Sequence, residues 1–482
     1  MPMTTQEQIG TVLTVSTLDT LVDIYWRASV ESQNVTNNDT ARPQSRTFKL
    51  AHDAVMPAEM RILPDRETRT RLSELYYQNH YLTLPMVQRE VLRVCEENIH
   101  IPHCLFLCNA VYYCGSITST NLAEGEDDGE EFFLRGQDIL KERYLGTHIC
   151  TIQGLLLFAN GNRTIAQRTG FVNQAINMAR TIGIHTRQDE SINSIMKAYL
   201  ARVFWCCFIY DSTLSAIGGG PALINNEDVT VDMFEAGDLG SEGDTCSDQY
   251  MLHSVRGWLV YREIRNYYNQ IAQGPQHSRQ FLFNRLDQLD KSLVEWQEQL
   301  PIVLDIFPTK KSITSPIKAM ATGAQLLCYS LIIFLHYPNL PDPKSSYTPF
   351  TGEQGGPPDS QGYCTQAAKE IIRIISILLE KAPWILRQDI AARYALNMAI
   401  RIHHYDSKVT YDTIFAREAG RNLQKAIVLA GETFSEHDSF NWESSGEGTN
   451  PRDDPMAFAF LPSGLEDDVR ALPPSEDNGH EH

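Results

Sequence analysis

The stretch "RVFWCCFIYDSTLSAIGGGPALI" spans residues 202–224 and contains two adjacent cysteines, several aromatic side chains, an aspartate and three glycines that run into a proline. Two interpretations compete for it. A cysteine nucleophile beside a phosphate-binding loop would make it a reactive site. A packed helix that ends at the glycines would make it part of a core.

The cysteines favour the packed helix. Neighbours on a helix point about 100° apart, so Cys206 and Cys207 cannot share a face. A reactive thiol needs a nearby cation that lowers its pKa, whereas burial between Trp205 and Phe208 would raise it. Free cysteine is also among the most often buried residue types. We therefore expect both thiols to be buried and unreactive.

The glycines favour the end of a helix. A Walker phosphate loop needs a Lys and a Ser or Thr after its glycines, and the sequence contains no such string. Glycine readily adopts the left-handed conformation at a helix C-terminus, and proline cannot continue a helix. The pattern therefore predicts that a helix ends at Gly218, Gly219 and Gly220, before Pro221, and that Asp211 anchors the turn that follows.

Helical periodicity continues on both sides of this stretch. Apolar residues recur at three- and four-residue steps, with Gly183 where a helix C-terminus favours glycine. The stripe before it consists of Val172, Ala175, Ile176, Ala179 and Ile182, and the stripe after it of Leu200, Val203, Phe204, Cys207, Tyr210 and Leu214. Further periodic segments cover 66–82, 85–99, 135–160, 250–272, 279–301, 317–338, 365–382, 385–406 and 411–434. Acidic or glycine-bearing loops are expected at 121–131, 186–193, 235–250 and 338–362.

Strict apolar–polar alternation is almost absent, so we predict an all-α fold of packed antiparallel helices. Three parts are expected: a partly disordered segment over 1–60, a large helical domain over 61–435, and an acidic disordered tail over 436–482. From residue 431 onward there are thirteen Asp or Glu and two Arg. The tail fits either an activation segment that folds on a partner or an ordinary frayed terminus.

Composition restricts the classes of function. The 482 residues carry a formal net charge of −19, which argues against a large surface for nucleic-acid phosphates. The N-terminus lacks the pattern of a secretory signal, and the apolar run 326–337 is too short to span a bilayer. We therefore expect an intracellular protein with reduced cysteines and no membrane partner.

Other candidate sites are weak. His100, His103, Cys104, Cys108 and Cys114 fall close together, but the chain has no C-x2-C pair to begin a structural zinc site. The adjacent histidines at 403 and 404 diverge on a helix, and a G-x-S-x-G nucleophile elbow is absent. We predict no catalytic, cofactor-binding, metal-binding or DNA-binding residues, no cofactor and no enzyme activity.

The ordered series of segments resembles the fungal-specific transcription factor domain, the regulatory middle region of fungal zinc-cluster transcription factors. The segment 201–231 resembles its hallmark, with matching positions at Arg202, Trp205, Phe208, Asp211, Leu214, Ser215, Gly218, Pro221, Ile224 and Asp228. Segments similar to other landmarks of the family occur at 72–92, 149–160, 174–188, 293–301, 328–340 and 363–375. The resemblance covers residues 65–435.

The chain departs from the family pattern in two ways. Ser212 and Gly219 stand where arginine is usual, so an arginine contact near this turn is expected to be missing. A six-cysteine zinc cluster needs two C-x2-C pairs, yet residues 1–60 contain no cysteine, and four Lys or Arg against seven Asp or Glu. We therefore expect no direct DNA binding by the family's route.

The resemblance implies a nuclear transcription regulator of a fungus that acts through protein contacts. Its partner would be a DNA-binding transcription factor, a coactivator or a second copy of the chain, and its targets a metabolic, secondary-metabolite gene cluster. Two alternatives stay open. The chain could be a helical domain that senses a small-molecule effector and modulates a DNA-binding partner, or a truncated gene model of a complete zinc-cluster factor.

Overall fold

A computed structural model describes most of the chain between residues 56 and 425. The described residues are 56–117, 129–141, 145–160, 164–192, 194–218, 220–237, 242–272, 279–300, 316–340, 359–381, 390–409, 417–418, 420–422 and 425. The predictions for the first 55 residues and for the tail 436–482 lie outside them.

All regular structure in these residues is helical, which confirms the all-α prediction. The α-helices are α3 (Arg66–Gln78), α4 (His80–Thr83), α5 (Arg89–Glu97), α6 (Pro102–Ile117), α7 (Glu130–Lys141), α8 (Ile149–Phe158), α9 (Ile165–Thr181), α10 (Ser194–Gly218), α11 (Glu242–Ala272), α12 (Arg279–Glu298), α13 (Pro316–His336), α14 (Ser360–Lys381) and α16 (Ile390–Val409). Short 3-10 turns are η1 (Ala58–Met60), η2 (Asn226–Asp228) and η4 (Tyr337–Asn339).

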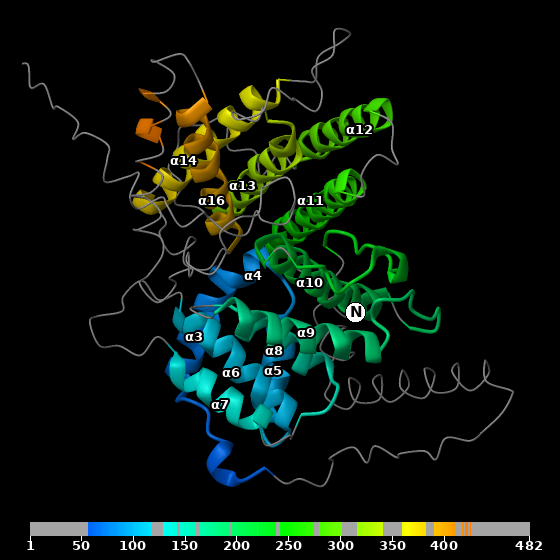
Figure 1. Cartoon of the computed structure of the whole chain (residues 1–482). Coiled ribbons are helices and arrows are strands. Elements are labelled where there is room, and N and C mark those ends of the chain that lie inside the picture. Colours follow the sequence, from blue (N-terminus) through cyan, green and yellow to red (C-terminus); the bar gives the residue numbers. More distant parts are fainter. Residues whose placement is uncertain are drawn as a thin grey trace, which may run out of the picture.

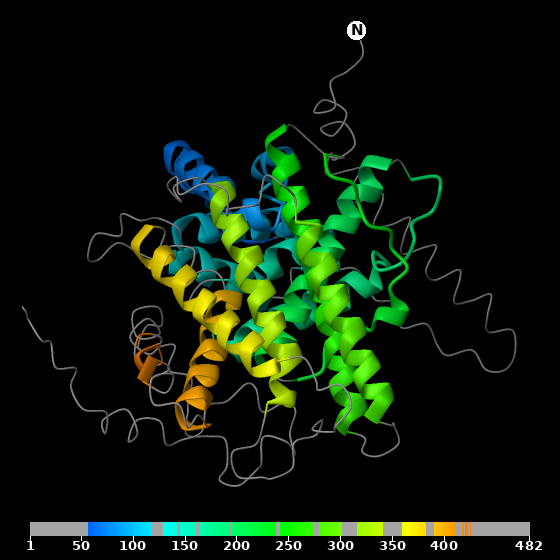
Figure 2. The same ribbon diagram turned by 90° about the horizontal axis from the view of Figure 1, so that it is seen from above.

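The helices form two groups joined by α10 (Figure 1). In the first group α6 packs against α3, α5, α7 and α8, and in the second α13 packs against α11, α12, α14 and α16. Figure 2 shows the long helices of the second group, coloured green to yellow, lying side by side. One continuous apolar core runs through both groups.

Helix α10 is buried on all sides because it lies between α8 and α9 on the one hand and α11 and α16 on the other. The predicted stripe is mostly buried, but residues off the stripe such as Tyr199 and Cys206 are fully buried too. Residues 194–217 form a helix that is long and apolar enough to cross a membrane. The sequence analysis considered only the apolar run 326–337 and did not predict this helix as a candidate span. However, 83% of its apolar window is buried inside the fold, as in the core helix of a globular protein.

The predicted helix ends are confirmed. Gly183 has a φ of 79° and follows α9, and the N–H of Ile184 donates to the carbonyl of Ala179 at 3.1 Å. This 6→1 bond is the mark of a Schellman motif, which requires a left-handed residue at the position of Gly183. Helix α10 ends at Gly218, the first of the three glycines.

Two predicted loops are shorter than expected. Helix α11 begins at Glu242 and includes most of the acidic segment 235–250, and α7 begins at Glu130, inside 121–131. Acidic residues are favourable in the first turn of a helix because they face its positive end. The described ends of these two acidic segments, Glu130–Glu131 and residues 242–250, therefore lie in helices and not in loops.

Candidate functional site

The hallmark stretch runs into an extended connection between α10 and α11, residues 220–237, which we call the strap. Apart from η2 it has no regular secondary structure. The backbone N–H groups of Thr230 and Val231 both donate to the carbonyl of His185, at 3.1 and 3.2 Å. The strap is therefore tied at Thr230 and Val231 to the turn after α9.

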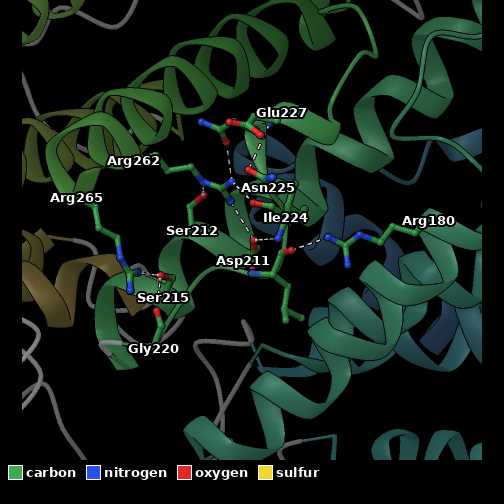
Figure 3. A network of polar contacts seen from close by, with 12 residues as sticks. Arg180, Asp211, Ser212, Ser215, Gly220, Ile224, Asn225, Glu227, Arg262 and Arg265 are labelled. Carbon is green, nitrogen blue, oxygen red and sulfur yellow. Dashed lines mark hydrogen bonds and ion pairs between the residues drawn. The ribbon is translucent and has the colours of Figure 1, made fainter. Parts of the chain in front are cut away.

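Asp211 holds the first part of the strap. Its side chain is near the C-terminal end of α10 and is only 5% exposed. One carboxylate oxygen accepts the N–H of Leu223 at 2.9 Å, and the other accepts the N–H of Ile224 at 2.8 Å (Figure 3). The prediction that Asp211 anchors the following turn is thus confirmed.

Arg262 of α11 completes this junction. Its guanidinium donates to the Asp211 carboxylate at 2.9 Å, to the Ser212 hydroxyl at 3.0 Å and to the Asn226 side chain at 2.8 Å. The guanidinium also lies 4.0 Å from the centre of the Phe208 ring. Burial lowers the pKa of Arg262, and the neighbouring Asp211 opposes that shift. The junction is therefore a buried and fully bonded ion pair.

The expectation that this turn lacks an arginine contact is wrong. Besides Arg262, Arg265 donates to the Ser215 hydroxyl, which in turn donates to the carbonyl of Gly220 at 2.8 Å (Figure 3). Arg180 of α9 donates to the carbonyl of Leu223 at 2.6 Å. The arginines come from other helices, because the short side chain at position 212 accepts a hydrogen bond instead of supplying a guanidinium.

A second buried pair holds the other end of the strap. Arg202 of α10 makes a two-bond contact with Asp248 of α11, and the two side chains are 2% and 1% exposed. The Asp248 carboxylate also accepts the N–H of Gly237 at 2.9 Å. The Arg202 guanidinium lies 4.4 Å from the centre of the Phe234 ring. This contact fixes α10, α11 and the end of the strap together.

The two junctions stabilise the fold and do not form a catalytic or ligand-binding site. Both carboxylates are occupied by N–H donors and a guanidinium, so neither resembles an open ligand or a general base. Within the residues that the structure describes, no group of three or more His, Cys, Asp or Glu is arranged to hold a metal ion. Together the junctions fix the positions of the side chains around the hallmark stretch of this sequence and do not form a reactive centre.

The comparison with protein families finds a match in this region. Residues 74–289 match the fungal specific transcription factor domain. The match begins within α3, ends within α12 and includes the strap with both of its junctions. It confirms the resemblance that the sequence indicated, although it is shorter than the predicted range 65–435. The domain boundaries at 61 and 435 stay predictions.

Curated relatives are fungal transcriptional regulators. An uncharacterised transcriptional regulatory protein of Schizosaccharomyces pombe is 21% identical over 42% of this chain and 31% of its own. A putative transcriptional regulatory protein of the same yeast is 20% identical over 68% of this chain and 41% of its own. An ABC-transporter-regulating transcription factor of Aspergillus fumigatus is 24% identical over 38% and 22%. The chain thus spans less than half the length of these relatives, and no solved structure matches it.

The cysteines of the hallmark stretch pack as predicted. Cys206 and Cys207 have no exposed surface, and burial raises the pKa of both thiols. Cys104, Cys108 and Cys114 are also at most 1% exposed. The interpretation of these residues as core is confirmed.

The histidines near these cysteines are not gathered into one site. His100 is exposed, whereas His103 stacks on His148 with ring centres 3.7 Å apart. His403 is fully buried within the second helix group, and burial lowers its pKa to about 4. His148 could not be paired with His103 from the sequence, because they lie on elements far apart in the chain.

Sequence reasoning also missed a hydrogen-bonded trio on α12, α13 and α14. The buried ring of His336 lies 3.2 Å from Asp290 through Nε2 and 3.2 Å from the Ser360 hydroxyl through Nδ1. The residue types are those of a hydrolase triad, which is recognised by geometry rather than sequence position. Here, however, the serine is 4% exposed at the first turn of α14. The contacts fasten three helices of the second group to one another.

Proposed function

We propose that this chain is a fungal regulator of transcription that acts in the nucleus through protein contacts. The observation that carries the proposal is the match of residues 74–289 to the fungal specific transcription factor domain. The names of the curated relatives, all transcriptional regulators, support the same function. The two buried junctions described above give the domain a fixed shape on which a partner can dock.

Charge supports contacts with protein rather than with DNA. The chain carries a net charge of −19, and its sequence contains no C-x2-C pair for a zinc cluster. We propose that the partner is a DNA-binding factor, a coactivator or a second copy, and that the acidic tail 436–482 acts as an activation segment. Target genes would be metabolic. The relative from Aspergillus fumigatus, which is named for regulating an ABC transporter, adds transporter genes as a target class.

A reporter experiment tests the regulatory function. The full chain is fused to an unrelated DNA-binding module and expressed in a fungal host with a matching reporter gene. We expect the fusion to change reporter expression and to accumulate in the nucleus, and we expect a matched fusion ending at residue 435 to lose activation. An unchanged reporter with the full-length fusion would contradict the proposal.

A binding experiment tests the mode of action. Purified chain is mixed with promoter fragments at several salt concentrations. Tight binding without a partner, with an affinity that falls steeply as salt rises, would show direct phosphate contacts and contradict the protein-contact mode. Sequencing the 5′ end of the transcript addresses the remaining alternative, in which an upstream exon encodes a zinc cluster.

Small-molecule sensing is a second candidate function, favoured by a groove of about 250 Å³ between α11 and α12. Three of its lining residues are apolar and four are polar: Leu259, Val260 and Trp296, and Arg256, Ser292, Glu295 and Gln299. Apolar side chains beside polar groups that can orient a ligand are a feature of small-molecule sites. An effector that binds here would raise the melting temperature of the full chain with concentration, and Arg256→Ala would reduce that shift.

We also propose that the chain is not an enzyme. The arrangement of Ser360, His336 and Asp290 in the described part of the chain resembles a catalytic triad, but its serine is buried, so an activated phosphonate probe should leave Ser360 unlabelled. Labelling of the wild-type chain that disappears in Ser360→Ala and in His336→Gln would overturn this. Labelling that persists in both variants would also overturn it, because it would reveal another nucleophile.

A further inference from the structure

The groove between α11 and α12 lies beside two contacts that join these helices. The indole of Trp296 on α12 stacks on the ring of His253 on α11, with the ring centres 4.4 Å apart. Further along the pair, Arg285 of α12 forms an ion pair with Glu263 of α11. The two helices are therefore antiparallel, and about 15 Å of helix separates the two contacts along α11.

The apolar part of the groove is fixed in place. Besides the stacking, Nε1 of Trp296 donates to the carbonyl of His253 at 2.9 Å. Gly257 of α11 allows the indole to come this close, because a Cβ at that position would lie 2.6 Å from an indole carbon. The other apolar lining residues, Leu259 and Val260, are half-buried on α11. A ligand therefore meets a preformed apolar surface, which lowers the cost of binding.

Two opposite charges line the same groove. Arg256 on α11 and Glu295 on α12 are both lining residues, and both are exposed. Among the described residues neither forms an ion pair, in contrast to Arg285 and Glu263 nearby. A guanidinium can bind a carboxylate through two parallel hydrogen bonds, and a carboxylate accepts hydrogen bonds from an ammonium group. The groove therefore offers one site for an anion and one for a cation.

These charges restrict the class of ligand. A ligand with only a carboxylate would place its negative charge near that of Glu295, and a ligand with only an amine would place its positive charge near that of Arg256. A zwitterion presents an opposite charge to each side chain. The rest of the ligand should be apolar, because it lies against Leu259 and Val260.

The volume of the groove restricts the size of the ligand. The groove measures about 250 Å³, less than the roughly 300–1,000 Å³ of sites for drug-sized ligands. An apolar cavity of about 150 Å³ holds benzene, so the groove has room in proportion for roughly ten non-hydrogen atoms. That is about the size of L-leucine, an α-amino acid with a branched apolar side chain.

We propose that the groove between α11 and α12 binds a free aliphatic α-amino acid of about the size of leucine. Arg256 binds its carboxylate, Glu295 binds its ammonium group, and its side chain packs on the apolar lining. The proposal rests on the second candidate function, small-molecule sensing, and gives the effector a chemical class. Because both charged side chains are exposed, added salt should weaken the binding.

The test uses the purified full chain, L-leucine as the probe, and calorimetric titration together with thermal melting. We expect the melting temperature to rise with the concentration of L-leucine. Two analogues each lack one charge: 4-methylpentanoate has no amine, and 3-methylbutylamine has no carboxylate. Each should bind about fivefold more weakly than L-leucine, the upper end of what an exposed ion pair contributes.

Two variants assign the charges to their side chains. Arg256→Gln should weaken binding of L-leucine about fivefold without weakening that of 3-methylbutylamine. Glu295→Gln should weaken binding of L-leucine to a similar extent without weakening that of 4-methylpentanoate. Glu298→Gln is the matched control, since Glu298 is an exposed carboxylate on the same helix but outside the lining. It should bind L-leucine like wild type.

Absence of L-leucine binding to the wild-type chain would overturn the proposal, as would equal binding of L-leucine and either analogue. Unchanged L-leucine binding by Arg256→Gln or Glu295→Gln would overturn it too. An uncharged effector whose melting shift is reduced in Arg256→Ala would support small-molecule sensing but contradict the amino-acid ligand. Conversely, L-leucine binding by a chain whose reporter fusion is inactive would support the site and contradict the regulatory function.

Discussion

The two ends of the strap are both held by a buried arginine–aspartate pair, but the pairs are built differently. Arg262 divides its donors between Asp211, the Ser212 hydroxyl and groups on the strap. Arg202 instead gives its bonds to Asp248 alone, and its Nη1 has no hydrogen-bond partner. One junction is a shared network, and the other is an isolated pair.

This difference indicates at which junction the loss of one charged partner costs more stability. A buried ion pair gains stability only when the remaining donors and acceptors are also satisfied. At the shared network several bonds survive the loss of one partner. At the isolated pair, loss of the arginine leaves a carboxylate that is 1% exposed with little besides one backbone N–H. The isolated pair should therefore be the more sensitive of the two.

Arg202→Leu should have the largest effect. We expect the free energy of unfolding to fall by about 3–5 kcal/mol, because the substitution leaves an uncompensated buried charge on Asp248. Urea unfolding of the purified chain measures it. The double variant Arg202→Leu with Asp248→Leu should recover most of the loss, since apolar residues can replace a buried pair. No recovery in the double variant would show that the pair is not isolated.

Asp211→Asn should have a smaller effect, of about 2 kcal/mol. The amide keeps one acceptor oxygen, whereas the native carboxylate accepts two strap N–H groups and the guanidinium of Arg262. Hydrogen exchange provides a local readout, because the amides of Leu223 and Ile224 should exchange faster while those of α6 do not. Unchanged exchange at these two amides would contradict the anchoring role of Asp211.

Low pH should destabilise the folded chain through buried histidines that, unlike the two junctions, have no ion-pair partner. Burial lowers the pKa of His80, His253 and His403 to about 4, compared with about 6.5 in the unfolded chain. The folded state thus disfavours protonation, and stability is lost as the pH falls from about 6.5 towards 4. At pH 5 each histidine should contribute a loss of about 2 kcal/mol.

One substitution isolates this contribution. His403→Leu should reduce the difference in unfolding free energy between pH 7.5 and pH 5 by about 2 kcal/mol, whatever its effect at pH 7.5. The exposed His100 provides the control, and His100→Leu should leave the difference unchanged. An identical pH dependence for wild type and His403→Leu would contradict the assignment.

The sequence predicted the features that depend on local pattern. The end of α10 at Gly218, the Schellman turn at Gly183 and the packing of Cys206 follow from short-range rules that hold in almost any fold. The ordered landmarks predicted the domain that residues 74–289 match. The early start of α11 was missed because the acidic run suggested solvent, whereas Asp248 within that run is buried against Arg202.

The contacts that define the junctions could not be predicted. Arg262 lies 51 residues after Asp211, and Asp248 lies 46 residues after Arg202. No periodicity links such positions, so only the packing of α10 against α11 brings them together.

The smallest effect is expected for a third ion pair on the same strap, Arg187 with Asp232. Its atoms are 3.1 Å apart, close to the distances in the buried pairs, but the side chains are 74% and 71% exposed. Asp232→Ala should therefore lower the unfolding free energy by less than about 0.5 kcal/mol, and salt should reduce that further. A loss as large as that of Asp211→Asn would mean that tethering the strap, rather than burial of charge, determines the cost at all three positions.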